Sequence, residues 1–285
     1  MLRATENQRT PSFYINTLLR WVVMGSLLFV GQVQASLMIT PTRVVMDEKH
    51  RTAEVTLLNT TTSTKVYRIL WQELQQTSIG GYIELQGEGE NEYMSSDMIQ
   101  YSPRKVTIKP GKYQRIKLRL RMKGDMAEGE YRSHLVMKVT DVGVDPQSLE
   151  KNIDGAHMFI IPKLSFSIPV VVRKGANNSE TQIVSVDLNT QNADQAKMVV
   201  DISHKGEFSS FGNIYVYMKA NGGSQVEKIG ESHNIALFRE TERRTVTIPL
   251  RVSDVPAGAV IQVVYGGEDE YEGTQLGTAA FTYQP

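Results

Sequence analysis

The sequence predicts an all-β protein that consists of two sandwich domains joined by a short linker. Apolar residues recur at every second position in short runs between turn residues, which is the period of β-strands. No stretch sustains the period of an amphipathic helix. Without an N-terminal leader, the chain of 285 residues is still long enough for two domains that each bury a core.

The first 35 residues have the composition of a signal peptide. Arg20 precedes the apolar run WVVMGSLLFVG, and small residues then lead to a cleavage site expected after Ala35. A membrane anchor is the alternative, but the apolar run is shorter than the roughly 20 residues that span a bilayer. We therefore expect no stable membrane insertion after cleavage, and domains at residues 36–174 and 175–285.

The clearest strand of the first domain is RIKLRLRM, where apolar and basic residues alternate. Its apolar side chains are expected to face the core, and Lys117, Arg119 and Arg121 to face water. We assign this basic row no function, because a charged outer face is common on a half-buried strand. A later strand lies within EYRSHLVMKV. Its inward side is expected to carry Tyr131, Ser133, Leu135, Met137 and Val139.

The most apolar segment after the leader is HMFIIPKLSFSIPVVV, residues 157–172. From Leu164 onward apolar residues and serines alternate, which predicts a strand. Proline removes a donor from the hydrogen-bond ladder, so Pro162 and Pro169 predict an edge strand. Edge strands usually carry protective charge, yet Lys163 is the only Lys, Arg, Asp or Glu here. The segment is therefore either covered by its own fold or made to pair with another chain.

A linker is expected at RKGANNSE, residues 173–180, which combines charge, glycine and asparagine without apolar periodicity. Beyond it, six short strands separated by turn residues predict a second sandwich. These strands are TQIVSVDLNT, AKMVVDISHKG, NIYVYMKA, RRTVTIPLRV, AVIQVVYGG and GTAAFTYQ.

The composition argues against an enzyme. The chain has no cysteine, which excludes disulfides, thiolate metal sites and a cysteine nucleophile. Its five histidines lack a metal-ligand spacing, and the hydrolase and nucleotide motifs are absent. The acidic stretches GEGENEY and GGEDEYEG lack the order of a calcium loop and are interpreted as solvated turns. With 31 basic and 31 acidic residues, nothing favours nucleic acid as a partner, and we expect no cofactor.

Taken together, these features resemble those of the periplasmic pilus chaperones of the chaperone/usher pathway. The shared features are a signal peptide, the opening strand LMITPTRVVM, a turn at PGK before a strand, and a strand that ends in SIPVVVRKG ahead of a linker. The most specific of them are TPTRVV and IPVVVR. The resemblance covers essentially the whole chain after the leader, and it implies two immunoglobulin-like domains and a periplasmic location.

The resemblance implies that the last strand of the first domain is donated to a pilus or fimbrial subunit whose own fold lacks a strand. The subunit would then pass to an outer-membrane usher. By alternation, the donated face would consist of Met158, Ile160, Pro162 and Leu164, followed by Phe166. From Phe166 onward, ordinary core packing is the favoured alternative. An open apolar border also carries a risk of self-association when no subunit is bound.

A carboxylate anchor is also implied by the resemblance. Arg43, in TPTRVV, matches the arginine of the family that binds the terminal carboxylate of the subunit, and the guanidinium fork suits such a ligand. Without the family, Arg43 would be interpreted as a solvated strand residue. The second anchor of the family is a lysine, and Pro169 stands in its place. Lys163 or Arg173 is the candidate substitute.

An alternative function belongs to another class. Two exported immunoglobulin-like domains could form a surface or adhesion module that binds a ligand through its loops. In such a module, the last strand of the first domain would be fully covered by its own fold.

Overall fold

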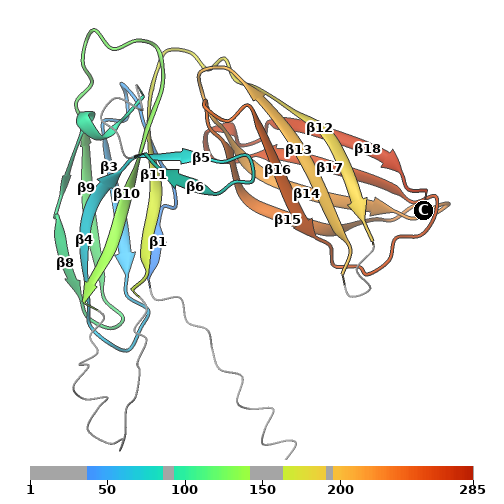
Figure 1. Ribbon diagram of the computed structural model, residues 1–285, viewed down its shortest axis with the longest axis horizontal. Helices are drawn as coiled ribbons and strands as arrows, with labels where there is room; N and C mark the ends of the chain where they lie inside the picture. Colours follow the sequence, from blue (N-terminus) through green and yellow to red (C-terminus); the bar gives the residue numbers. More distant parts are fainter. Residues whose placement is uncertain (1–36, 86–92, 142–162, 191–194, 285) are drawn as a thin grey trace, which may run out of the picture.

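The computed structural model contains two β-sandwiches set at an angle to each other (Figure 1). It describes residues 37–85, 93–141, 163–190 and 195–284. The expected leader and three residues of the expected donated face, Met158, Ile160 and Pro162, lie outside the described residues. Within them, the helical elements are two short 3-10 turns, η1 (Ser96–Met98) and η2 (Asp269–Tyr271). The all-β, two-sandwich prediction is confirmed.

The first sandwich packs a four-stranded sheet against a five-stranded sheet. The four-stranded sheet has the order β1 (Met38–Thr40), β3 (Thr52–Leu58), β9 (Tyr113–Leu120) and β7 (Ile99–Ser102). The five-stranded sheet has the order β2 (Val44–Met46), β11 (Ser165–Lys174), β10 (Gly129–Asp141), β4 (Lys65–Gln72) and β8 (Lys105–Ile108).

The alternation predicted for the first sandwich is confirmed. On β9 the side chains of Ile116, Leu118 and Leu120 are buried in the core, and the basic residues between them face outward. On β10 the inward row predicted from Tyr131 to Val139 is buried in the same core. The outward row of β10 is buried at Arg132, His134 and Val136, because other parts of the molecule cover them, whereas Lys138 and Thr140 are exposed.

The opening segment forms two strands, although a single strand was expected. β1 pairs antiparallel with β3 in one sheet, and β2 pairs parallel with β11 in the other. Pro41 lies between them and offers no N–H to a ladder, so pairing is interrupted there. The chain thereby changes sheets just before Arg43, which places this arginine at the end of the sandwich nearest the second one.

The second sandwich also consists of two sheets. One has the order β12 (Glu180–Asn189), β13 (Lys197–Lys205) and β16 (Arg243–Pro249). The other has the order β15 (Val226–Leu237), β14 (Ser210–Lys219), β17 (Val260–Gly267) and β18 (Gln275–Thr282). Six of these strands were expected from the sequence. β15 was missed, because the register shifts between it and β14 and its apolar residues do not alternate.

The two sandwiches have separate cores and share a third apolar cluster. This interdomain cluster joins Val171 of β11 to Phe211, Ala236, Phe238 and Tyr271 of the second sandwich. The strands extend into the expected linker at both ends, so only residues 175–179 connect β11 to β12. A short connection and a shared apolar cluster both limit how freely the sandwiches move relative to each other.

Candidate functional site

β11, predicted as an edge strand, lies between β10 and the short β2 and is open along only part of its length. On one side it pairs with β10 from Ser165 to Lys174. On the other side β2 pairs only with Val170–Val172. From Ser165 to Pro169, β11 therefore has a strand on one side only within the described residues. Pro169, which lacks an N–H, lies in this open part, where a missing donor costs least.

The apolar face of β11 emerges from the core toward the start of the strand. Ile168, Val170 and Val172 are buried, Phe166 is half-buried against the core, and Leu164 is 57% exposed. These positions alternate along one face, so the same apolar row passes from the interior to the surface. Lys163 is exposed beside Leu164. The described part of the predicted segment thus offers unpaired backbone next to an exposed apolar side chain.

Arg43 lies in the contact between the two sandwiches and is only 5% exposed. Its Nη1 donates to Oε1 of Glu270 at 2.5 Å, and its Nη2 donates to Oγ of Ser209 at 3.0 Å. The guanidinium also lies 4.8 Å from the ring centroid of Phe211. Its Nε is buried without a hydrogen-bond partner among the described residues.

Arg173 shares a carboxylate with Arg43. Its Nη1 lies 2.9 Å from Oε1 of Glu270, and its Nε donates to Oε2 of the buried Glu130 at 3.0 Å. Burial tends to raise the pKa of Glu270, but Arg43 and Arg173 outweigh it and hold that pKa below its usual range. The Glu270 turn, interpreted from the sequence as solvated, is therefore an interdomain contact. One carboxylate of the second sandwich thus bridges two arginines of the first.

A cavity of about 420 Å³ lies beside this ion-pair network. Thr42 and Arg43 line it from the first sandwich, and Phe211, His233 and Asp269 from the second. A carboxylate that entered this cavity would meet Arg43 already bound to Glu270, so it would have to displace that residue.

A second interdomain contact was not found from the sequence. Strands β5 (Leu74–Gln76) and β6 (Tyr82–Glu84) form a hairpin that extends from β4 toward the second sandwich (Figure 1). Its tip accepts a hydrogen bond from the backbone of the second sandwich, from Thr245 N to Ser78 O at 2.8 Å. Gln76 also accepts a bond from Phe238 N.

Arg132 fixes the base of this hairpin to the second sandwich. Its Nη2 donates to the backbone oxygen of Leu74 at 2.9 Å and forms an ion pair with Glu240. Its guanidinium lies 3.8 Å from the ring centroid of Phe238. Sequence alternation places Arg132 on the outward face of a strand, where an arginine is normally solvated. No local signal distinguishes it from a surface residue.

Two kinds of functional site are absent from the part of the chain that the structure describes. No group of three or more His, Asp or Glu residues there is arranged to hold a metal ion. In that same part, no helix has the length and apolar character that a membrane crossing requires.

Comparisons with known proteins give a structural likeness only. No protein-family model and no curated protein matches the sequence. The CupB2 chaperone of Pseudomonas aeruginosa is 9% identical with a TM-score of 0.40, over 86% of this chain and 100% of that one. The SafB chaperone structure with the SafA pilin of Salmonella enterica is 11% identical with a TM-score of 0.41, over 89% and 99%.

A third similar structure is the CsuC–CsuE chaperone–tip adhesion subunit pre-assembly complex, from the archaic chaperone-usher Csu pili of Acinetobacter baumannii. It is 14% identical with a TM-score of 0.42, over 86% of this chain and 98% of that one. At identities and TM-scores this low, the likeness carries no functional assignment. The function is therefore inferred from the contacts of this chain itself.

Proposed function

We propose that this protein is a periplasmic, non-enzymatic chaperone of pilus assembly. It binds a pilus or fimbrial subunit by donating the strand that precedes and includes the start of β11, and it delivers the subunit to an outer-membrane usher. The observation that carries the proposal is the open part of β11, where β2 does not reach and Leu164 is exposed.

The physical basis is that the donated strand and the incomplete sandwich of the subunit cover each other's exposed apolar side chains and unpaired backbone groups. A sandwich that lacks a strand exposes apolar side chains and unpaired backbone groups, both of which are costly in water. An added strand with apolar residues at every second position satisfies both, since its backbone forms the ladder and its side chains fill the groove. The row that emerges at Phe166 and Leu164 has this pattern, and it would continue through Pro162, Ile160 and Met158.

Arg43 is the proposed anchor for a terminal carboxylate of the subunit. In the free protein its guanidinium is bound to Glu270. The incoming carboxylate would therefore exchange with Glu270 at Arg43, while Arg173 retains Glu130 as its partner. Arg173 is the proposed second anchor, because its Nη1 lies 2.9 Å from the Oε1 of Glu270 that Arg43 also binds. Lys163, the other candidate, precedes the part of β11 beside β2 and lies roughly 20 Å along the strand from Arg43.

The test is capture of a subunit in the periplasm. The double variant Ile160→Asp and Leu164→Asp is expected to remain soluble but to lose co-purification with its subunit, because a charge in an apolar groove is costly. Co-expression with small exported proteins, followed by asking which one is rescued from degradation, identifies the subunit. Ser167→Asp is the matched control, since it adds one charge to the same edge on the opposite face, where Ser167 is exposed. Undiminished recovery of the complex with the double variant would refute strand donation.

A surface or adhesion module requires a fully covered last strand in the first sandwich. In the structure, β2 covers only Val170–Val172 of the ten residues of β11. No contact of the described residues favours this alternative over strand donation.

A further inference from the structure

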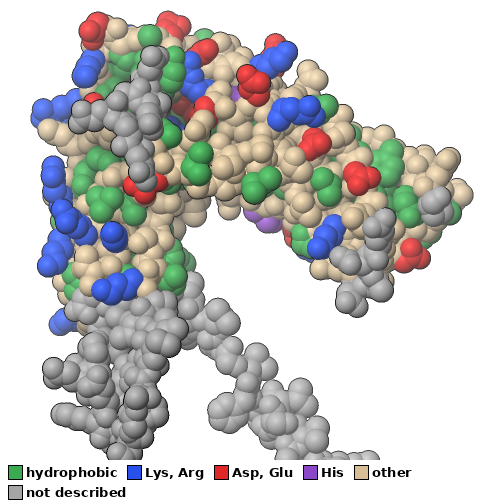
Figure 2. Space-filling view, viewed as in Figure 1, with side chains coloured by type: hydrophobic (Ala, Val, Ile, Leu, Met, Phe, Trp, Pro, Cys, Tyr) green, Lys and Arg blue, Asp and Glu red, His purple; other side chains and the backbone are tan. Residues whose placement is uncertain are grey.

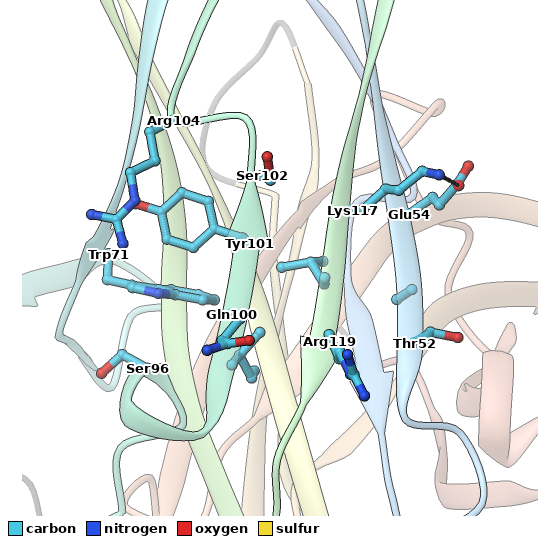
Figure 3. A pocket seen from close by; sticks show the side chains of 13 residues that line it. Thr52, Glu54, Trp71, Ser96, Gln100, Tyr101, Ser102, Arg104, Lys117 and Arg119 are labelled. Atoms are coloured by element: carbon cyan, nitrogen blue, oxygen red, sulfur yellow. Dashed lines mark ion pairs between the residues drawn. The ribbon is translucent and has the colours of Figure 1, made fainter.

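A large cavity lies at the edge of the first sandwich, next to strand β7. Its volume is about 980 Å³. Figure 3 shows β7 running through it, with Trp71, Tyr101 and Arg104 on one side and Lys117 and Arg119 on the other. In the five-stranded sheet, β4 carries Trp71 and lies away from β11. The cavity is therefore on the opposite flank from the proposed donated strand.

On the aromatic side of the cavity, the side chains are held in place by contacts with one another and with the backbone. The rings of Trp71 and Tyr101 meet edge to face, with centroids 5.5 Å apart and an angle of 83°. The hydroxyl of Tyr101 donates to the backbone oxygen of Ile69 at 3.0 Å, and Arg104 lies 5.5 Å from the ring of Tyr101. These side chains form a fixed apolar wall with a cation at its rim.

The cavity as a whole carries unbalanced positive charge. Glu54 is the one carboxylate among the lining residues, against the cations Arg104, Lys117 and Arg119. Glu54 already contacts Lys117 at 3.9 Å, whereas Arg104 and Arg119 form no ion pair within the described residues. The whole chain has no net charge, so the cations are concentrated locally. Figure 2 shows Lys and Arg side chains gathered along this outer margin.

The backbone of β7 is also available. β7 is the last strand of its sheet, and on its far side no strand lies within the described residues. Alternate backbone groups of an antiparallel edge strand point away from its partner and can accept another strand. Lys117 and Arg119 are two residues apart on β9, so their side chains repeat at about 7 Å. Alternate side chains of an added strand have the same repeat.

We propose that β7 and this cavity form a second binding surface, which takes an extended acidic segment of a partner protein. The segment would pair with the open edge of β7, direct alternate carboxylates at Lys117 and Arg119, and place an apolar side chain against Trp71 and Tyr101, where Arg104 adds a cation at the rim. The cations repel a basic strand but attract an acidic one, so they select the partner. Because this edge lies opposite β11, both edges can be occupied at once, and the proposal does not depend on strand donation.

The probe is the capped peptide GEYETEVEG, with GQYQTQVQG as its uncharged counterpart. The chain has two tryptophans, and Trp21 lies in the expected leader, so the protein purified after the expected cleavage has Trp71 in the cavity wall as its single reporter. We expect the acidic peptide to change the fluorescence of Trp71 and to bind about tenfold or more tightly than the uncharged peptide. Binding should weaken as salt is raised.

Paired variants distinguish a site from general charge attraction. Lys117→Gln with Arg119→Gln should weaken binding about tenfold. Arg115→Gln with Arg121→Gln removes the same charge from the same outward side of the chain but outside the cavity lining, and should change binding little. All four side chains are exposed, so the fold is preserved. Absence of binding, equal losses in both pairs, or tighter binding of a sulfated hexasaccharide would each overturn the proposal.

Discussion

Arg43 has a structural role that the sequence did not reveal. The sequence suggested an arginine open to a carboxylate of a partner, whereas the structure places it almost fully buried against Glu270 and Ser209. A buried guanidinium needs a partner, because an unpaired charge in the interior is costly. Glu270 supplies that partner in the free protein, so Arg43 contributes to the contact between the sandwiches before any subunit binds.

Replacement of Arg43 by Ala is therefore expected to affect stability as well as subunit binding. It removes two hydrogen bonds of a charged group, which lowers the free energy of unfolding by about 1–3 kcal/mol. Urea unfolding measures this loss, and co-purification of the subunit measures binding. Arg115→Ala is the control, since its contact with Glu54 is long and exposed and is worth less than about 1 kcal/mol. An equal fall in the free energy of unfolding in both variants would show that the buried contact with Glu270 is worth no more than an exposed ion pair.

His134 is a second buried polar residue that affects stability. It is 1% exposed, its two ring nitrogens have no hydrogen-bond partner among the described residues, and it meets the ring of Tyr82 edge to face. Burial, reinforced by the neighbouring Arg132, lowers the pKa of His134 to about 3. The folded protein therefore keeps this imidazole neutral under conditions in which the unfolded chain binds a proton.

The stability of the fold should therefore fall as the medium is acidified. Below the unfolded pKa of His134, near 6.5, the unfolded state binds more protons than the folded state until the pH approaches 3. Above that unfolded pKa, the buried His134 costs the fold almost no stability. Between pH 7 and pH 5, it lowers the free energy of unfolding by about 2 kcal/mol. Urea midpoints at both pH values measure it. His134→Gln should reduce the difference. The buried His204, whose pKa is also lowered by burial, contributes in the same direction.

Among the elements, the β5–β6 hairpin connects the sandwiches outside the linker. It leaves the first sandwich after β4 and bonds to the second through Gln76 and Ser78. Gly80 at its turn has a φ of +83°, which favours glycine, and it packs against the guanidinium of Arg244. Arg132 holds the base of the hairpin through Leu74 and Glu240.

Glu240→Ala tests whether the hairpin holds the two sandwiches at a fixed angle. The change leaves Arg132, 7% exposed, buried without its carboxylate partner, which favours separation of the hairpin from the second sandwich. The chain lacks cysteine, so spin labels at Lys109→Cys and Lys219→Cys report the distance between the sandwiches. We expect a broader distance distribution in Glu240→Ala and no change in the control Glu54→Ala. A distribution as narrow as that of the parent protein would contradict a bracing role.

At the scale of the whole molecule, the two sandwiches are joined by an apolar cluster and two polar contacts. The cluster centres on Val171 and Phe238, one from each sandwich. The ion pairs of Glu270 lie at one contact, and the hairpin forms the other. The open half of β11 and the cavity at β7 lie at different edges of the first sandwich. Under the two proposals, the first sandwich would present two strand edges to two partners.

The sequence by itself determined the fold class, the alternation of β9 and β10, and the incomplete pairing of the strand that contains Pro169. These features follow from local periodicity and from the missing N–H of proline, which act over a few residues. Tertiary structure alone decided the partners of Arg43, Arg132 and Glu270. Those partners lie far away in the chain, and an arginine that alternation places on a strand surface has the same local pattern whether water or a second domain covers it.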